Sequence, residues 1–79
     1  MKTIYKHIFF EEISLPRKTK TFVVRNKAIN SLLGTVKWYA PWRQYCFFPT
    51  PSDLVFSATC LADIQDFIRE LMNWYRRKQ

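Results

Sequence analysis

The chain is poor in the residues on which small catalytic and disulfide-stapled proteins depend. Its 79 residues include one glycine, one histidine and two cysteines. One glycine excludes a glycine-rich phosphate loop, and one histidine with two cysteines cannot complete a four-coordinate zinc site in one chain. Cysteine catalysis needs a nearby base, yet His7 lies far upstream of Cys46 and Cys60. We therefore expect no enzyme, no metal site and no cofactor.

Carboxylates are scarce as well. Six Asp and Glu stand against thirteen Lys and Arg, which gives a formal net charge of +7. Acid–base catalysis could use only Glu11–Glu12 or Asp63–Asp66, and the second pair suits the polar face of a helix better. The charge predicts a positive surface that attracts anionic partners, or one that merely keeps an aromatic-rich chain in solution.

Long apolar runs are also missing. None approaches the roughly 18 residues that span a bilayer, and the N-terminal segment lacks the apolar core of a signal peptide. Two cysteines without short spacings suit a reducing compartment. We expect a cytoplasmic protein that folds as one domain over residues 1–79, because so short a chain supports only one core.

Period-two alternation and short runs of β-branched and aromatic residues predict strands in the first two thirds of the chain. These cover residues 3–10, 21–25, 33–39, 44–48 and 54–56. Between them we predict a loop over 14–20, turns at 26–27 and 30–31, a hairpin tip over 40–43, and a proline-bracketed turn over 49–53.

From about residue 59 to 77 the apolar period changes to three and four, which predicts an amphipathic helix N-capped by Ser57 or Thr59. Its predicted apolar stripe comprises Leu61, Ile64, Ile68, Leu71, Met72 and Tyr75, flanked by Phe67 and Trp74. The predicted fold is therefore α+β: a small antiparallel sheet of four to five strands with one C-terminal helix packed on one face.

One helix leaves the other face of such a sheet uncovered. The strand at 33–39 places Val36 and Trp38 on one face and Lys37 and Tyr39 on the other, and the 44–48 strand divides its side chains in the same way. Aromatic groups therefore fall on both faces, although both cysteines are expected in the core. The uncovered face is predicted to be a binding surface or the interface of a homodimer.

Residues 37–49 interleave two cations with six aromatic rings. Such rings can stack bases while cations contact phosphates, or they can simply form the core. Trp42 and Arg43 at the hairpin tip have the composition of a binding hot spot. Other cations, at 17–20, 25–27 and 76–78, could form a phosphate-tracking stripe if the loop and the helix end share one side. The predicted binding residues are Lys37, Tyr39, Trp42, Arg43, Arg17, Lys18, Lys20 and Arg25.

Several segments carry a resemblance to a known family. They read Leu-Gly-Thr-Val-Lys-Trp-Tyr over 33–39 and Pro-Trp-Arg-Gln-Tyr-Cys-Phe-Phe-Pro over 41–49, followed by Cys-Leu-Ala-Asp-Ile over 60–64 and by Phe67. In its C-terminal half the chain thus resembles short proteins encoded by bacteriophages and prophages. The resemblance implies no activity and no functional residue. It implies a phage context, in which small proteins inhibit host nucleases and defence systems, as anti-CRISPR proteins do, or bind nucleic acid or nucleotides.

We therefore expect a small non-enzymatic phage-type binding protein in the host cytoplasm. It would interfere with a host nucleic-acid-handling or defence protein through the hairpin around Trp42 and Arg43. The alternative is direct binding of DNA, RNA or a nucleotide by the basic, aromatic surface. The expected partners are accordingly a host protein or a nucleic acid, with no membrane, and a homodimer is a further expectation.

Overall fold

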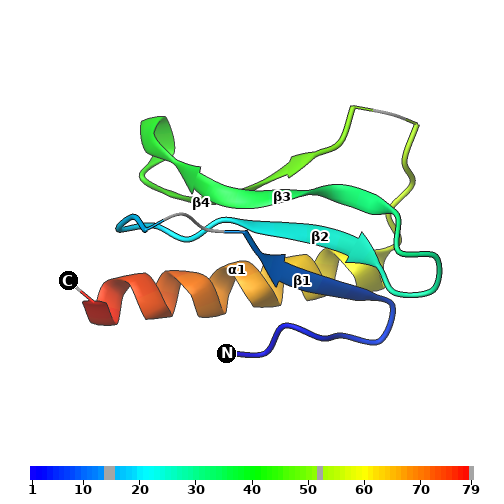
Figure 1. The fold of residues 1–79 in the computed structure, drawn as a ribbon, viewed down its shortest axis with the longest axis horizontal. Helices are drawn as coiled ribbons and strands as arrows, with labels where there is room; N and C mark the ends of the chain where they lie inside the picture. The colour runs from blue at the N-terminus through cyan, green and yellow to red at the C-terminus, as the bar shows by residue number, and fades with distance from the viewer. Residues whose placement is uncertain (14–15, 52, 79) are drawn as a thin grey trace.

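The computed structural model describes residues 1–13, 16–51 and 53–78. It contains a four-stranded antiparallel sheet and one long helix that covers one face of it (Figure 1). In chain order the elements are β1 (Ile8–Glu12), β2 (Phe22–Asn26), β3 (Leu32–Tyr39), the 3₁₀ turn η1 (Ala40–Trp42), β4 (Gln44–Pro49) and α1 (Ala58–Lys78). The strands pair in the order β1-β2-β3-β4. The predicted α+β fold is confirmed.

The register of β3 and β4 decides which aromatic side chains face the helix. Trp38 pairs with Tyr45 and Val36 with Phe47. Tyr45 and Val36 are almost completely buried, and Trp38 and Phe47 pack against the same core. Because side chains alternate along a strand, the intervening residues of both strands point away from α1. The predicted division of each strand between two faces is confirmed.

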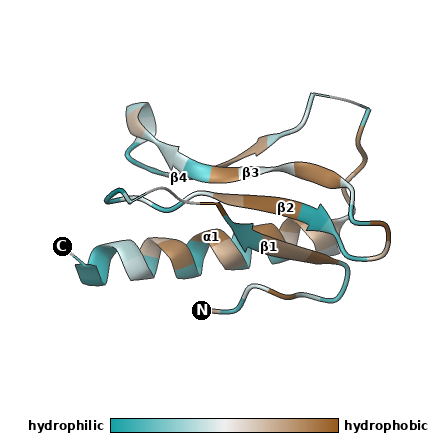
Figure 2. Ribbon diagram, in the orientation of Figure 1, coloured by the Kyte–Doolittle hydropathy of each residue, from teal (hydrophilic) through white to brown (hydrophobic). Residues whose placement is uncertain are grey.

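Phe67 is the centre of the core between the sheet and α1. Its ring is fully buried, stacks on Phe10 at a centroid distance of 3.9 Å and meets Phe22 edge-on at 4.8 Å. Figure 2 shows hydrophobic residues along the strands and on α1, whereas the last turn of α1 is hydrophilic. The predicted stripe is therefore wrong at two positions. Phe67 lies at its centre rather than its flank, and Leu61 is half exposed, because α1 turns its Ile64–Phe67–Leu71 row toward the sheet.

The start of α1 is fixed by a side-chain cap. The Ser57 hydroxyl accepts a hydrogen bond from the Cys60 backbone N–H at 3.2 Å and shares a second one with the Thr59 hydroxyl at 2.9 Å. A hydroxyl in this place satisfies one of the N–H groups that the first turn leaves unpaired. Of the two predicted caps, the structure selects Ser57.

The predicted strand over residues 3–10 is wrong in its first half. The chain turns back on itself, so that the Tyr5 N–H donates to the Ile8 carbonyl at 2.9 Å and the Phe10 N–H donates to the Thr3 carbonyl at 2.8 Å. In an unbroken strand Tyr5 and Phe10 would point to opposite faces, since they are five residues apart. The reversal lets both rings enter the core, where they meet edge-on at 5.6 Å.

The predicted fifth strand is also wrong, because residues 53–57 are irregular. Leu54 and Phe56 still pack against the core and Val55 is almost fully exposed. The side chains therefore alternate between core and solvent as predicted, but among the described residues the segment pairs with no strand of the sheet. The predicted turns at 26–27 and 30–31 are confirmed: the Asn26 side chain accepts from the Ala28 N–H at 2.8 Å, and Asn30 has a positive φ of 58°. Ser14 and Leu15 of the predicted loop, and Ser52 of the predicted turn, lie outside the described residues.

Tyr5 ties the N-terminal segment to α1. Its hydroxyl donates a hydrogen bond to the Asp66 carboxylate at 2.7 Å. Burial, this hydrogen bond and the nearby carboxylates all favour the neutral phenol and raise the pKa of Tyr5 far above its usual value.

We expect this raised pKa to make stability fall in alkaline solution. The unfolded phenol ionises near pH 10, whereas the folded one keeps its proton, so the free energy that Tyr5 contributes is fully present below about pH 10 and is lost above it. Urea unfolding of the natural chain and of Tyr5→Phe should differ by about 1 kcal/mol at neutral pH. The difference should shrink above about pH 10. A difference that stays constant to pH 11 would contradict the assigned hydrogen bond.

Within the described part of the chain, no helix has the length and apolar character needed to cross a membrane.

Candidate nucleic-acid interface

The sheet face opposite α1 carries a row of three aromatic rings, Phe48, Tyr39 and Trp42, which we call the aromatic row. Tyr39 meets Phe48 edge-on at a centroid distance of 5.8 Å and meets Trp42 edge-on at 5.1 Å. The Lys37 ammonium group lies 4.7 Å from the centre of the Phe48 ring. The row thus runs from the edge strand β4 across the end of β3 to the β3–β4 hairpin tip, with a cation beside it.

The hairpin tip presents Trp42 to solvent. The η1 turn contains Pro41 and ends at Arg43, which takes the left-handed conformation with φ 53° and donates its N–H to the Ala40 carbonyl at 3.1 Å. This tight reversal reconnects the chain to β4 and leaves Trp42 65% exposed. A large ring at an exposed turn can contact a partner without first leaving the core.

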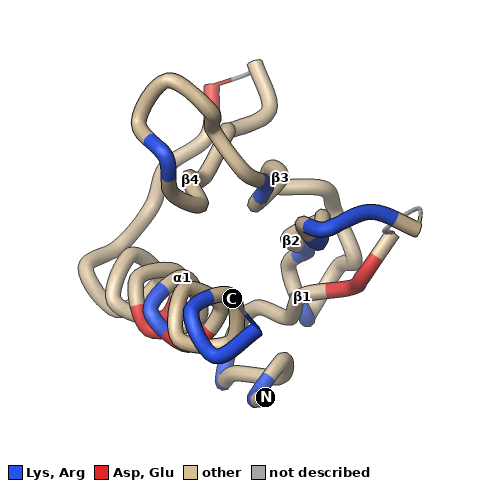
Figure 3. Tube along the Cα trace, turned by 90° about the vertical axis from the view of Figure 1, so that its left-hand side faces the viewer, with Lys and Arg blue, Asp and Glu red and all other residues tan. Residues whose placement is uncertain are grey.

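Basic residues from three distant parts of the sequence gather at one end of the molecule. The β1–β2 loop, the hairpin tip and the C-terminal turn of α1 all lie at this end (Figure 1), and Figure 3 views it directly. We call it the basic end. It carries seven of the thirteen Lys and Arg residues: Arg17, Lys18, Lys20, Arg43, Arg76, Arg77 and Lys78. Such a concentration of one sign creates a local positive potential that attracts polyanions.

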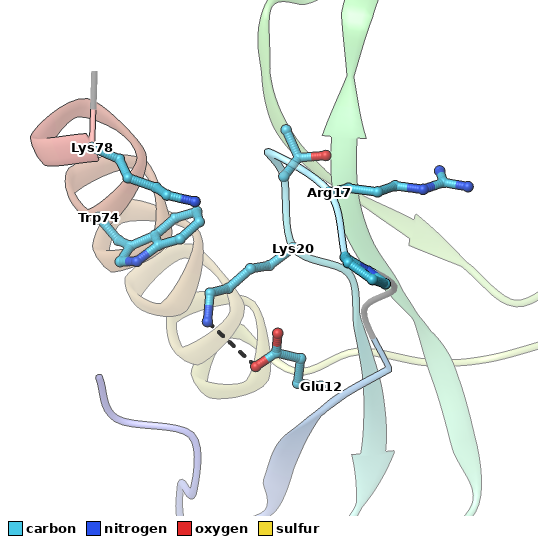
Figure 4. Close-up of a pocket in the computed structure, with 7 residues that line it drawn as sticks. Glu12, Arg17, Lys20, Trp74 and Lys78 are labelled. Carbon is cyan, nitrogen blue, oxygen red and sulfur yellow. Dashed lines mark hydrogen bonds and ion pairs between the residues drawn. The ribbon is translucent and has the colours of Figure 1, made fainter.

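A groove of about 420 Å³ lies within the basic end, between the β1–β2 loop and α1 (Figure 4). It is lined by Glu12, Pro16, Arg17, Thr19, Lys20, Trp74 and Lys78. The ammonium groups of Lys20 and Lys78 lie 5.0 and 4.9 Å from the centre of the Trp74 ring. We call this the Trp74 groove. The sequence predicted a phosphate-tracking stripe only if the basic loop and the basic helix end lie on the same side of the molecule. In the structure they do.

Two hydrogen bonds position the loop side of the groove. The Lys20 N–H donates to the Tyr45 hydroxyl at 3.1 Å, which attaches the loop to a buried residue of β4. The Lys20 ammonium group donates to the Glu12 carboxylate at 3.4 Å. The burial of Tyr45 raises the pKa of its hydroxyl, so the hydroxyl stays protonated as it accepts the Lys20 N–H.

The predicted binding residues fall into two groups rather than one. Lys37, Tyr39 and Trp42 belong to the open face and hairpin tip, and Arg43 completes the tip. The loop residues Arg17, Lys18 and Lys20 belong to the basic end, although Figure 4 shows the Arg17 guanidinium directed away from Trp74. Arg25 lies on the open face, opposite Phe9 on β1.

Arg25 is already engaged within the protein. Its Nε lies 3.3 Å from a Glu11 carboxylate oxygen, and its Nη1 donates to the Asn30 carbonyl at 3.4 Å. An exposed ion pair of this kind contributes little to stability, about 0–1 kcal/mol, but it reduces the positive charge that the residue offers to a partner. Of the predicted cations, Arg25 and Lys20 are the two with carboxylate partners among the described residues.

Trp74 is a functional candidate that the sequence prediction missed, whereas Lys78 was considered only as part of the basic cluster at 76–78. Trp74 was assigned only to the flank of the apolar stripe. The available signal was the spacing of Trp74 and Lys78, because residues four apart lie on the same side of a helix. What the sequence did not show is that the β1–β2 loop brings Lys20 to the same ring.

The prediction that both cysteines lie in the core is wrong for Cys46. Cys60 packs against the core, but Cys46 pairs with Lys37 on the open face and is only partly buried. Partial burial raises the pKa of the Cys46 thiol, which disfavours the reactive thiolate. In the segments that the structure describes, no group of three or more His, Cys, Asp or Glu side chains is arranged to hold a metal ion.

Comparison of the chain with protein-family models, with curated proteins and with solved structures found no match. The resemblance to phage-encoded proteins therefore stays a prediction.

Proposed function

We propose that this protein binds single-stranded nucleic acid without catalysing a reaction, through the aromatic row and the basic end together. The observation that supports the proposal is that three basic segments lie at the same end of the molecule, where the aromatic row reaches solvent. Proteins that bind single strands combine a positive surface for the backbone with rings on which bases stack. Both elements are present side by side at the hairpin tip.

Each part has a defined role in this proposal. Trp42, the most exposed ring of the aromatic row, stacks on an unpaired base, and Tyr39 supports it from the sheet. Lys37, beside Phe48, contacts a neighbouring phosphate. The cations of the basic end continue the phosphate path beyond the tip. Without a deep groove-reading helix on this face, the protein recognises backbone and base faces rather than sequence.

Salt dependence tests the proposal. Binding of a fluorescent single-stranded oligonucleotide should weaken steeply with salt, because each phosphate contact releases counterions, with a slope of about −0.7 in log K against log salt per contact. The double variant Arg17→Gln/Lys18→Gln should therefore lower the slope by about 1.4. Trp42→Ala should weaken binding about tenfold at constant slope, since base stacking on a ring contributes about 1–3 kcal/mol.

The matched control changes the same charge elsewhere. Lys6→Gln/Arg69→Gln also removes two exposed cations, but neither residue lies at the basic end. This variant should leave the slope almost unchanged. If both double variants lower the slope equally, binding follows net charge alone and the proposed interface is wrong.

A protein partner is the second candidate function, favoured by Trp42 being 65% exposed beside Arg43 on a tight turn. Trp and Arg dominate the energetics of protein interfaces, so the tip could insert into a host nucleic-acid-handling or defence protein in the manner of an anti-defence inhibitor. Capture from nuclease-treated host lysate separates the two functions. A protein retained by the natural chain and lost with Trp42→Ala favours this candidate, and loss of all retained material on nuclease treatment favours direct nucleic-acid binding.

Either partner would be met in the host cytoplasm. A homodimer through the open face is less favoured, because this face carries the exposed ammonium group of Lys37. Packing two copies face to face would bury this charge in each copy without providing it with an opposite charge. Light scattering at high protein concentration tests this expectation.

A further inference from the structure

The Trp74 groove has the composition of a nucleotide site. Its volume, about 420 Å³, lies in the range of small-ligand sites. One wall is the half-buried indole of Trp74, and cations approach that indole from two elements, Lys20 from the loop and Lys78 from α1 (Figure 4). A flat ring beside converging cations suits a ligand that joins an aromatic base to a phosphate.

The arrangement of the two lysines leaves positive charge in the groove that an anion would neutralise. Both ammonium groups lie close to one ring, so their nitrogens are at most about 10 Å apart, within a Debye length at 0.1 M salt, and they repel each other. Lys20 has a partial counter-charge in Glu12 at 3.4 Å. Lys78 has no carboxylate partner among the described residues. A phosphate placed between the two would relieve this repulsion.

Binding of a phosphate between the two lysines would also uncover the Trp74 ring. Both lysine side chains are long, and Lys78 is exposed, so their ammonium groups can move from the indole to a phosphate without disturbing the backbone. The backbone of Lys20 stays attached to Tyr45 through its N–H during this change. The indole face that the amines occupy in the free protein then becomes available for a base, and base–indole stacking replaces the cation–ring contacts.

We propose that the Trp74 groove binds a nucleoside phosphate, with the base against Trp74 and the phosphate between Lys20 and Lys78. This inference rests on the proposed function, because the groove is part of the basic end. It adds a ligand class and a place for it. The same chemistry is found in a free nucleotide and in the phosphorylated end of a strand.

Titration of the full chain with AMP, adenosine and inorganic phosphate tests the ligand class. AMP should bind at least about tenfold more tightly than either fragment, the affinity ratio that corresponds to losing one charge-assisted hydrogen bond or one stacked ring. The three tryptophans give three indole N–H signals in a ¹H–¹⁵N spectrum. AMP should shift chiefly the one that disappears in Trp74→Phe.

The control variants are neighbours in the last turn of α1. Lys78→Gln should weaken AMP binding about tenfold, whereas Arg77→Gln, which removes the same charge one residue away but outside the groove lining, should change it less than about twofold. Equal effects of the two variants would overturn the site, as would phosphate or adenosine binding as tightly as AMP. Both residues are exposed, so neither variant should unfold the protein.

Oligonucleotides with a 5′-phosphate or a 5′-hydroxyl show whether the groove binds a free nucleotide or the phosphorylated end of a strand. The same experiment separates this inference from the proposed function. Tighter binding of the phosphorylated strand, lost in Lys78→Gln, identifies a strand end as the ligand. AMP binding without oligonucleotide binding identifies a free nucleotide and overturns the proposed function alone. Oligonucleotide binding that ignores the 5′-phosphate, together with no binding of AMP, overturns the groove as a nucleotide site and leaves the proposed function standing.

Discussion

Phe67→Ala should remove a large share of the protein's free energy of unfolding. Phe67 is fully buried and contacts Phe10 and Phe22 from two different strands, so its removal leaves a cavity between α1 and the sheet. Truncation of a buried Phe costs about 3–5 kcal/mol. A domain of this size has about 4–12 kcal/mol of stability in total. Urea unfolding followed by circular dichroism measures the loss.

Leu61→Ala in the same helix is the matched control. Leu61 is 50% exposed and was predicted to lie in the buried stripe. Its truncation should cost less than about 1 kcal/mol, because most of its apolar surface is already in contact with water. If Leu61→Ala destabilises as much as Phe67→Ala, the rotation of α1 about its axis is not the one described.

Gly34→Ala should produce the second large effect. A Cβ atom at this position would lie 2.5 Å from the Phe48 carbonyl oxygen and 2.6 Å from the Phe47 ring. A side-chain ring such as that of Phe47 can rotate aside, but the carbonyl belongs to the backbone of β4, which pairs with β3 at this point. The strands must therefore separate locally, at a cost of about 1–3 kcal/mol or more. The same urea titration reports this cost.

Thr35→Ala is the control for Gly34→Ala. Thr35 is the next residue of β3 and points to the open face, where the shorter side chain meets no obstacle. We expect a loss of at most about 1 kcal/mol, the range of strand propensity. A Gly34→Ala protein as stable as Thr35→Ala would show that β3 and β4 are farther apart than the structure places them.

Local patterns predicted most of the secondary structure. Alternation and β-branched or aromatic runs located β2, β3 and β4 nearly to the residue, and the change of period located α1. The errors occurred where alternation exists without a partner strand, at residues 3–7 and 54–56. Period two indicates that alternate side chains are buried, but it does not supply the neighbouring strand that makes a segment part of a sheet.

The candidate site was predicted less completely for the same kind of reason. Trp42 and Arg43 could be recognised because a proline turn at a hairpin tip is exposed by its local geometry. The Trp74 groove could not be, since Lys20 and Trp74 are separated by more than fifty residues and meet only through the tertiary fold. The basic clusters of the loop and the helix end are evident in the sequence, but their placement on one side of the molecule is not.

The sequence by itself determined the class of the fold, the excess of positive charge and the presence of aromatic residues on both sheet faces, because these follow from composition and periodicity. Only the tertiary structure decided that Tyr45 and Phe47 face α1 while Tyr39 and Phe48 stay uncovered. It also decided that three basic segments lie at the same end of the molecule (Figure 3). The physical reason is that one helix covers one face, and which face it covers depends on the packing of Phe67 between Phe10 and Phe22, which no local pattern encodes.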